Sequence, residues 1–270
     1  MEFTAEQLQE KFAELIATVE QFISSPRKEQ LIALYKKYEE RFYFAPASGK
    51  EHFHNAFPGG YLVHILNVVT AARGLYAAWN AFGIKVDNFT EEELVFSALN
   101  HDLGKIGDEE GEYYLPNPSS WHRINQGKVY ILNPALNFMN VTDRTFFMLQ
   151  KNGIVVTQNE YLGILLTDGL YEEKNKPYLV TYDKDYQLKI NLPHLLHHAD
   201  MMSLTKERDL WRKENVETLG AAKIDTKNMP KSKRSDPHVR NEERKKAFEK
   251  GNVTVQFENL LKKVGEGEKE

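Results

Sequence analysis

The sequence predicts an all-α, mostly helical protein, and three observations support this fold class. Apolar residues recur three and four positions apart in several long windows, which is the spacing of one helix face. Hydrophobic residues make up 41% of the chain and charged residues 27%, so a sizeable core can form and bulk disorder is excluded. The alternation typical of strands is weak, and at 178–192 it predicts one small β-hairpin.

The first 45 residues predict a helical pair that forms its own region. Thr4 and Gln7 are placed as a capping box at the start of the first helix. Ser24-Ser25-Pro26 ends that helix, and a second one is predicted over 28–42. Two copies of the chain could associate through these helices to form a homodimer, and the sequence does not decide whether they do. The apolar residues of the first helix share one face: Leu8, Phe12, Leu15 and Val19.

The region 46–218 is predicted to hold the functional domain. Its helices are expected at 58–82, 91–99, 142–150, 159–170 and 193–211. Gly83 is a suitable C-terminal stop, and the acidic residues 91–93 suit the positive end of a helix dipole.

Residues 219–270 are predicted to form a charged extension. Between Lys223 and Lys250, ten Lys and Arg stand against five Asp and Glu. The basic residues make nucleic acid a possible partner, but the interleaved acids and a net charge of −4 favour a solvated surface.

Composition narrows the chemistry of any site. The chain has no cysteine, which excludes disulfides, thiolate metal sites and a cysteine nucleophile. A metal would therefore need His, Asp and Glu, and nine histidines are present. No apolar run is long enough to span a membrane and no secretory signal is seen, so we expect a cytoplasmic protein without a membrane partner.

One group of residues has the chemistry of a metal site. His101-Asp102 stands at the end of an apolar helix, where Gly104 predicts a change of chain direction. His64 and Asp200 also lie in apolar surroundings. Buried ionisable groups are costly unless they are paired or bind a metal, so these four residues could form an N2O2 site for a divalent ion. The alternative is that His64 is a structural histidine and the His-Asp pair a chance dipeptide.

The segments around these residues match a known pattern. Leu99-Asn100-His101-Asp102-Leu103-Gly104-Lys105 fits an apolar-x-HD-apolar-GK signature, and Gly59-Gly60-Tyr61-Leu62-Val63-His64 fits a GG-x-L-x-H helix start. Over about 52–205 the chain thus resembles the HD-domain superfamily of metal-dependent phosphohydrolases. His54-Asn55-Ala56-Phe57 is similar to the HHxY segment of HD-domain 3′→5′ exoribonucleases but departs from it at its second and fourth positions. The segments 116–123 and 166–171 resemble HD proteins of tailed phages, for which the location would be the host cytoplasm.

The resemblance implies a set of metal ligands. His64, His101, Asp102 and Asp200 would hold the first ion, which could be Mn, Co, Ni, Mg, Zn or Fe. A possible second ion would use His122, with Thr167-Asp168 standing where two-metal members have a further histidine pair. The alternatives are that His122 packs on Trp121 and that Asp168 only forms a turn.

The same resemblance implies roles for the residues around the metal. Asp102 would bind the ion and orient its water. Lys105 would neutralise phosphate charge, with His54 and Arg123 as further phosphate contacts. His197 would give a proton to the leaving oxygen or support a ligand.

These roles imply hydrolysis of a phosphate ester, with a nucleotide as the favoured small-molecule substrate. Three alternatives remain open. The protein could be a 3′→5′ exonuclease or phosphodiesterase on oligo- or cyclic nucleotides, although the N-terminal helices lack an OB-fold pattern. It could be an inactive scaffold that binds a nucleotide or a protein. It could be a di-iron oxygenase, although the histidine set for that chemistry is incomplete.

Overall fold

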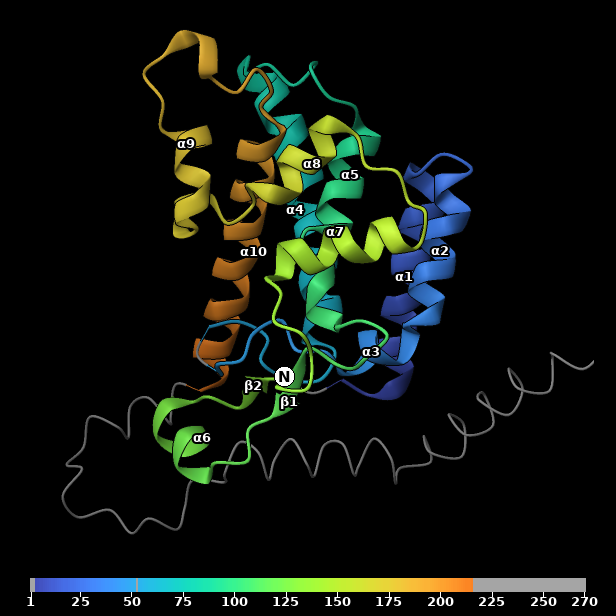
Figure 1. Cartoon of the computed structure of the whole chain (residues 1–270), viewed down its shortest axis with the longest axis vertical. Coiled ribbons are helices and arrows are strands. Elements are labelled where there is room, and N and C mark those ends of the chain that lie inside the picture. Colours follow the sequence, from blue (N-terminus) through green and yellow to red (C-terminus); the bar gives the residue numbers. More distant parts are fainter. Residues whose placement is uncertain (1–2, 52, 216–270) are drawn as a thin grey trace, which may run out of the picture.

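The computed structural model describes residues 3–51 and 53–215, and this part of the chain is mostly helical, as the sequence predicts (Figure 1). The charged extension predicted at 219–270 lies outside the described residues. None of the described helices is long and apolar enough to cross a membrane. The described helices are α1 (Ala5–Phe22), α2 (Arg27–Lys37), α3 (Glu39–Phe44), α4 (Gly60–Phe82), α5 (Glu91–Asn100), α6 (Ser120–Gln126), α7 (Val141–Lys151), α8 (Gln158–Leu165), α9 (Lys176–Leu179) and α10 (Leu192–Glu214).

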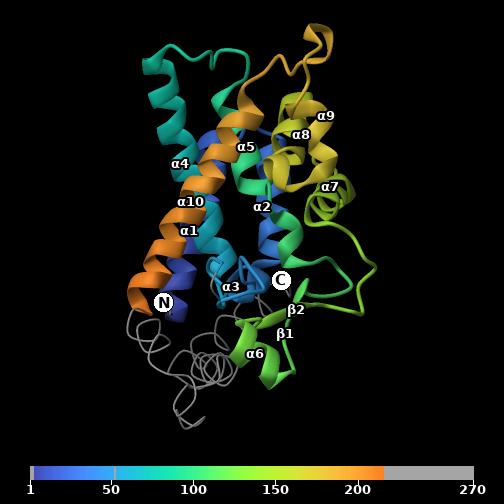
Figure 2. The same cartoon turned by 90° about the vertical axis from the view of Figure 1, so that its left-hand side faces the viewer.

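Helices α4, α5, α8 and α10 form the centre of the bundle. Helix α4 packs along α10 and also against α5, and α8 packs against both α5 and α10 (Figure 2). Helix α1 contacts α2, α3, α4 and α5. The 3₁₀ helix η1 (Leu103–Ile106) follows α5 directly and packs on α7. The segment that carries the His-Asp pair is therefore enclosed by helices from both halves of the chain.

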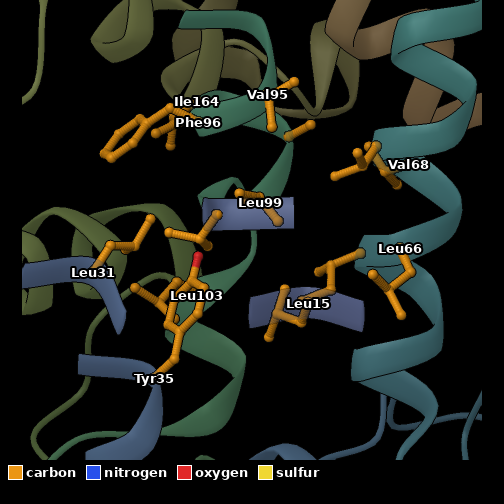
Figure 3. Packing of buried hydrophobic residues seen from close by; sticks show 14 of the residues in the cluster. Leu15, Leu31, Tyr35, Leu66, Val68, Val95, Phe96, Leu99, Leu103 and Ile164 are labelled. Carbon is orange, nitrogen blue, oxygen red and sulfur yellow. The ribbon is translucent and has the colours of Figure 1, made fainter. Parts of the chain in front are cut away.

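The hydrophobic core runs from the N-terminal helices into the central bundle. Figure 3 shows Leu15 of α1 and Leu31 of α2 in one cluster with Leu66, Val95 and Leu99. The apolar face of α1 is thus buried inside the chain, so it is not exposed for association with a second copy. The predicted pair is in fact three helices, because the chain leaves helical geometry at Tyr38. Phe42 and Tyr43, which follow this break, are both buried in the core.

The two-stranded sheet lies elsewhere than predicted. Strand β1 (Tyr114–Pro116) pairs antiparallel with β2 (Tyr130–Leu132), and α6 lies between them in sequence. The predicted hairpin at 178–192 is wrong, since this segment holds the end of α9 and the 3₁₀ turn η4 (Lys184–Tyr186). The Asp183 side chain accepts a hydrogen bond from the amide of Asp185, so local contacts occupy the backbone instead of a strand ladder.

The predicted helix ends are largely confirmed. Thr4 and Gln7 form the expected capping box, and Gly83 ends α4 in the left-handed conformation. Helix α8 ends at Leu165, five residues earlier than predicted, and the chain continues into the 3₁₀ helix η2 (Gly169–Tyr171).

Two glycines in the recognised motifs are explained by close packing. A Cβ on Gly60 would lie 2.0 Å from the carbonyl oxygen of Asn55, so the loop that carries His54 can fold tightly over the start of α4. A Cβ on Gly104 would lie 2.2 Å from the carbonyl oxygen of Val141 at the start of α7. Both glycines therefore let a neighbouring backbone approach the elements that carry His64 and His101.

Candidate metal centre

The structure brings the four predicted metal ligands together. His64 comes from α4, His101 and Asp102 from the end of α5, and Asp200 from α10. Nε2 of His64 lies 3.2 Å from Oδ1 of Asp200 and 3.6 Å from Oδ2 of Asp102. Nε2 of His101 lies 3.4 Å from Oδ2 of Asp102 and 3.9 Å from Oδ1 of Asp200. Residues separated by 136 positions thus meet at one point.

Hydrogen bonds fix how the two histidines face this point. Nδ1 of His101 lies 2.9 Å from the carbonyl oxygen of Ala98, which can only accept, so Nδ1 carries the proton. Nδ1 of His64 lies 3.1 Å from Oε2 of Glu207 and donates to it. Nε2 of each ring is buried and makes no hydrogen bond, even though carboxylate oxygens are close.

Such an arrangement suits a bound cation. If Nδ1 carries the only proton of each ring, the two Nε2 atoms and the two carboxylates present only lone pairs to one another, and a cation among them would satisfy all four groups. Donors held by one ion at about 2.1 Å lie roughly 3.0 to 3.4 Å apart, depending on the geometry. The separations here are close to this range. The buried His64–His101–Asp102 group could therefore hold a metal ion, and Asp200 adds a second carboxylate.

The charges around the cluster keep its carboxylates ionised. Burial would raise the pKa of the Asp102 carboxyl, but Lys105 and His101 hold it well below its usual value. Nζ of Lys105 lies 2.5 Å from Oδ2 of Asp102. Burial would also lower the pKa of His64, but the carboxylates of Glu207 and Asp200 raise it to about 10. The carboxylates thus favour a second proton on His64 when no ion is bound, and a cation bound at Nε2 would take the place of that proton.

His54 and Asp168 lie at the edge of the cluster. The ring of His54 is centred 5.0 Å from that of His64, and both of its nitrogens are buried without a hydrogen-bond partner. Burial and the nearby His64 hold the pKa of His54 well below its usual value, so its imidazole is neutral. Asp168 is exposed to solvent, yet surrounding protein atoms and the charge of Asp102 raise its pKa. Asp168 therefore lies at the edge of the cluster, close enough for the charge of Asp102 to act on its carboxyl group.

His197 faces a turn of the neighbouring segment. Its Nδ1 lies 2.6 Å from the carbonyl oxygen of Thr167 and donates to it. A Cβ on Gly169 would lie 2.6 Å from Cε1 of the His197 ring, so the turn packs directly on the imidazole. His197 therefore anchors the turn that carries Asp168.

His122 and Arg123 lie on α6, which Figure 1 shows at the lower end of the molecule, beyond the sheet. His122 is exposed, and its Nδ1 lies 2.7 Å from Oγ of Ser119. Arg123 is buried and donates to the carbonyl oxygen of Asn117, which fixes the loop before α6. The structure does not bring these residues into the cluster, in contrast to the roles predicted for them.

Replacing His122 with alanine is expected to leave the number of bound metal ions unchanged, because its side chain contacts Ser119 and Trp121 and belongs to neither group of potential ligands found among the described residues. Elemental analysis of the wild type and of His122→Ala measures this directly. Loss of one ion per chain in the variant would show that α6 supplies a ligand.

Sequence reasoning missed Glu207. This carboxylate is 2% exposed and faces His64 from α10. It follows Asp200 by seven residues, a spacing that places both on one helix face. The seven-residue spacing from Asp200 could have pointed to Glu207 in the sequence. Using it, however, requires knowing which face of α10 meets α4.

No family model matches this chain. Searches of curated proteins and of solved structures also find no match. The chemistry of the site is therefore argued from its geometry, and the resemblance to HD-domain proteins remains a prediction.

Proposed function

We propose that this protein is a metal-dependent phosphohydrolase that cleaves a phosphate ester of a nucleotide. One observation carries the proposal: two buried histidines direct their free Nε2 atoms at two carboxylates, with a lysine beside them. The match of the same residues to the HD-domain pattern supports the same chemistry. Histidine and carboxylate ligands suit Mn, Co, Ni, Zn, Fe or Mg, and the experiment below decides among them.

The proposal assigns a task to each side chain around the cluster. His64, His101, Asp102 and Asp200 would hold the ion, which when bound lowers the pKa of water and polarises a phosphoryl oxygen. About 15% of the Asp102 side chain is exposed, so the cluster is reached from solvent on this side. One of the two unpartnered nitrogens of His54 carries a proton and can donate a hydrogen bond to a phosphate oxygen, although a neutral ring does not add positive charge.

The test combines metal analysis with substrate turnover. Full-length protein without a histidine tag is analysed for metals and then assayed for phosphate release from mononucleotides, cyclic nucleotides and oligonucleotides with each divalent ion. We expect about one ion per chain and release from mononucleotides. If only oligonucleotides or cyclic nucleotides are hydrolysed, they are the substrate class instead of mononucleotides. Absence of both metal and turnover would contradict the proposal.

Replacing Lys105 with methionine is expected to lower kcat/KM while leaving the metal in place. A hydrogen bond to a charged group contributes about 1.5 to 3 kcal/mol, so kcat/KM should fall about 10- to 100-fold. Lys105→Arg keeps the charge and should restore part of the loss. Steady-state kinetics and elemental analysis of both variants check this. Loss of metal in Lys105→Met would mean that the lysine acts only by holding Asp102.

A further inference from the structure

Helix α10 places a second buried carboxylate two turns beyond Asp200. Asp200 and Glu207 are seven residues apart, so both face α4, the helix against which α10 packs most extensively. On α4, His64 and Asn67 are three residues apart and share the facing surface. A buried carboxylate is costly unless hydrogen bonds compensate it, which makes the partners of Glu207 informative.

Glu207 receives hydrogen bonds from two side chains of α4. Nδ1 of His64 lies 3.1 Å from Oε2, and Nδ2 of Asn67 lies 2.8 Å from Oε1. Asn67 is oriented in turn, because its Oδ1 accepts from Nζ of Lys206 at 2.7 Å. A continuous chain of hydrogen bonds therefore runs from Lys206 at the surface through Asn67 and Glu207 to His64.

We infer that Glu207 is a positioning residue that holds His64 in its metal-binding form, and that Asn67 fixes Glu207 for this task. With Glu207 accepting the Nδ1 proton, the other nitrogen of His64 is directed at Asp102 and Asp200, where it can bind an ion. A ligand histidine supported by a carboxylate is both oriented and made more basic. The inference depends on the proposed function only through the bound metal, not through phosphate chemistry.

A different role for Glu207 is also testable. His54, His64 and Glu207 have potential ligand atoms within 4.8 Å of one another, so Glu207 could itself bind an ion. Both oxygens of Glu207 already accept hydrogen bonds from His64 and Asn67, which favours the supporting role. The two roles differ in the number of ions bound when Glu207 is replaced.

The experiment measures zinc affinity and the protonation of His64 in the full-length protein. Zn²⁺ is titrated in competition with a chromophoric chelator, and ¹⁵N NMR of the zinc-loaded protein reports which His64 nitrogen carries the proton. The variants are Glu207→Ala, the isosteric Glu207→Gln, and Asp209→Ala as a control. Asp209 is an exposed carboxylate on the same helix that pairs only loosely with Arg212, at 3.7 Å.

Glu207→Ala is expected to weaken zinc binding about 10- to 100-fold and to lose the fixed Nδ1–H signal of His64. Glu207→Gln keeps an oxygen acceptor, so it should retain the signal with a smaller loss of affinity. Asp209→Ala should match the wild type. Circular dichroism confirms that each variant is folded, and Glu207→Gln carries the test if the alanine variant is not.

Two outcomes overturn the inference: unchanged affinity and His64 signal in both Glu207 variants, or one zinc fewer per chain, which would make Glu207 a ligand. Wild-type protein that binds zinc in a Glu207-dependent way but releases no phosphate would overturn only the proposed function. Wild-type protein that binds no zinc would overturn both.

Discussion

Replacing Asp102 with alanine is expected to remove the bound metal and to lower phosphate release at least about 1000-fold, since water without a metal is a far weaker acid. Asp102 is the residue on which the cluster converges. Its Oδ2 lies 3.4 Å from Nε2 of His101, 3.6 Å from Nε2 of His64 and 2.5 Å from Nζ of Lys105. Without this carboxylate, the imidazoles of His64 and His101 and the ammonium group of Lys105 lose the negative charge that lies between them. His101→Ala should have the same effect, because it removes a nitrogen donor from the same point.

Elemental analysis and phosphate release measure both effects, and circular dichroism checks that the helices remain. His198→Ala is the matched control. It removes an imidazole from the helix that carries Asp200, but His198 is exposed and bonds only to the carbonyl oxygen of His194 among the hydrogen bonds found here. Full activity in Asp102→Ala or His101→Ala would contradict the assignment of the site, whereas loss in His198→Ala would show that the effect is not specific.

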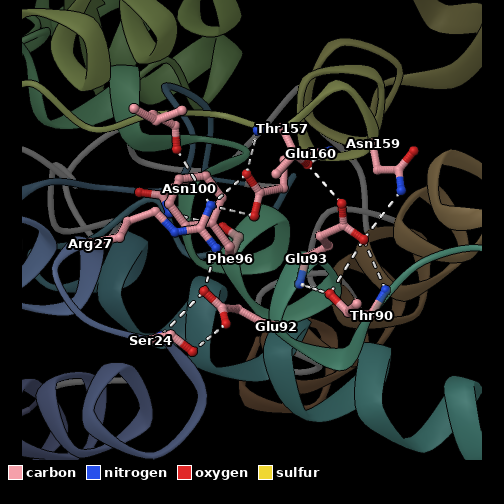
Figure 4. A network of polar contacts seen from close by, with 11 residues as sticks. Ser24, Arg27, Thr90, Glu92, Glu93, Phe96, Asn100, Thr157, Asn159 and Glu160 are labelled. Atoms are coloured by element: carbon pink, nitrogen blue, oxygen red, sulfur yellow. Dashed lines mark hydrogen bonds and ion pairs between the residues drawn. The ribbon is translucent and has the colours of Figure 1, made fainter.

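Replacing Arg27 with methionine is expected to destabilise the fold by about 3 to 5 kcal/mol, because it leaves a buried carboxylate without its cation. Arg27 stands at the start of α2 between Glu92 of α5 and Glu160 of α8 (Figure 4). Its Nη1 lies 2.7 Å from Oε1 of Glu160, whose side chain is fully buried. Its guanidinium also stacks over the ring of Phe96 at 4.4 Å. Methionine keeps apolar contact with that ring while removing the charge.

The loss of folding stability in Arg27→Met should depend on pH. Burial raises the pKa of Glu160 above its ordinary 4.5 even with Arg27 beside it, and removing Arg27 raises it further. The folded variant then binds a proton that the unfolded chain releases above pH 4.5, so its stability falls as the pH rises through this window. Urea unfolding at about pH 5 and about pH 8 should show the larger loss at the higher pH.

Two further variants make the Arg27 result specific. Arg212→Met removes an exposed arginine that lies 3.7 Å from Asp209, and it should change the free energy of unfolding by no more than about 0.5 kcal/mol. Adding Glu160→Gln to Arg27→Met neutralises the buried charge and should recover part of the lost stability. A single Arg27→Met variant as stable as the wild type would show that Glu160 does not depend on this cation.

The helices could be predicted because their signals are local. The capping box of Thr4 and Gln7 and the stop at Gly83 are each written in a few consecutive residues, and the structure confirms them. The hairpin at 178–192 failed because weak alternation competes with local side-chain contacts such as that of Asp183. The strands that do pair, Tyr114–Pro116 and Tyr130–Leu132, have only three residues each, too few for a clear period.

For the candidate site, residue type, apolar surroundings and the match to the HD-domain pattern together selected His64, His101, Asp102 and Asp200, which the structure brings together. Residue type was not enough for His122 and Arg123, because their positions depend on where α6 lies.

By itself the sequence determined the helical class, most helix ends and the identity of the four clustered side chains, since these follow from short-range spacing and from the cost of burying charge. Only the tertiary structure decided which atoms face one another. The support of His64 by Glu207 and the placement of Arg27 between Glu92 and Glu160 both join residues more than 60 positions apart. Such contacts depend on how α4, α5, α8 and α10 pack, and helix packing is set by the whole core rather than by any local pattern.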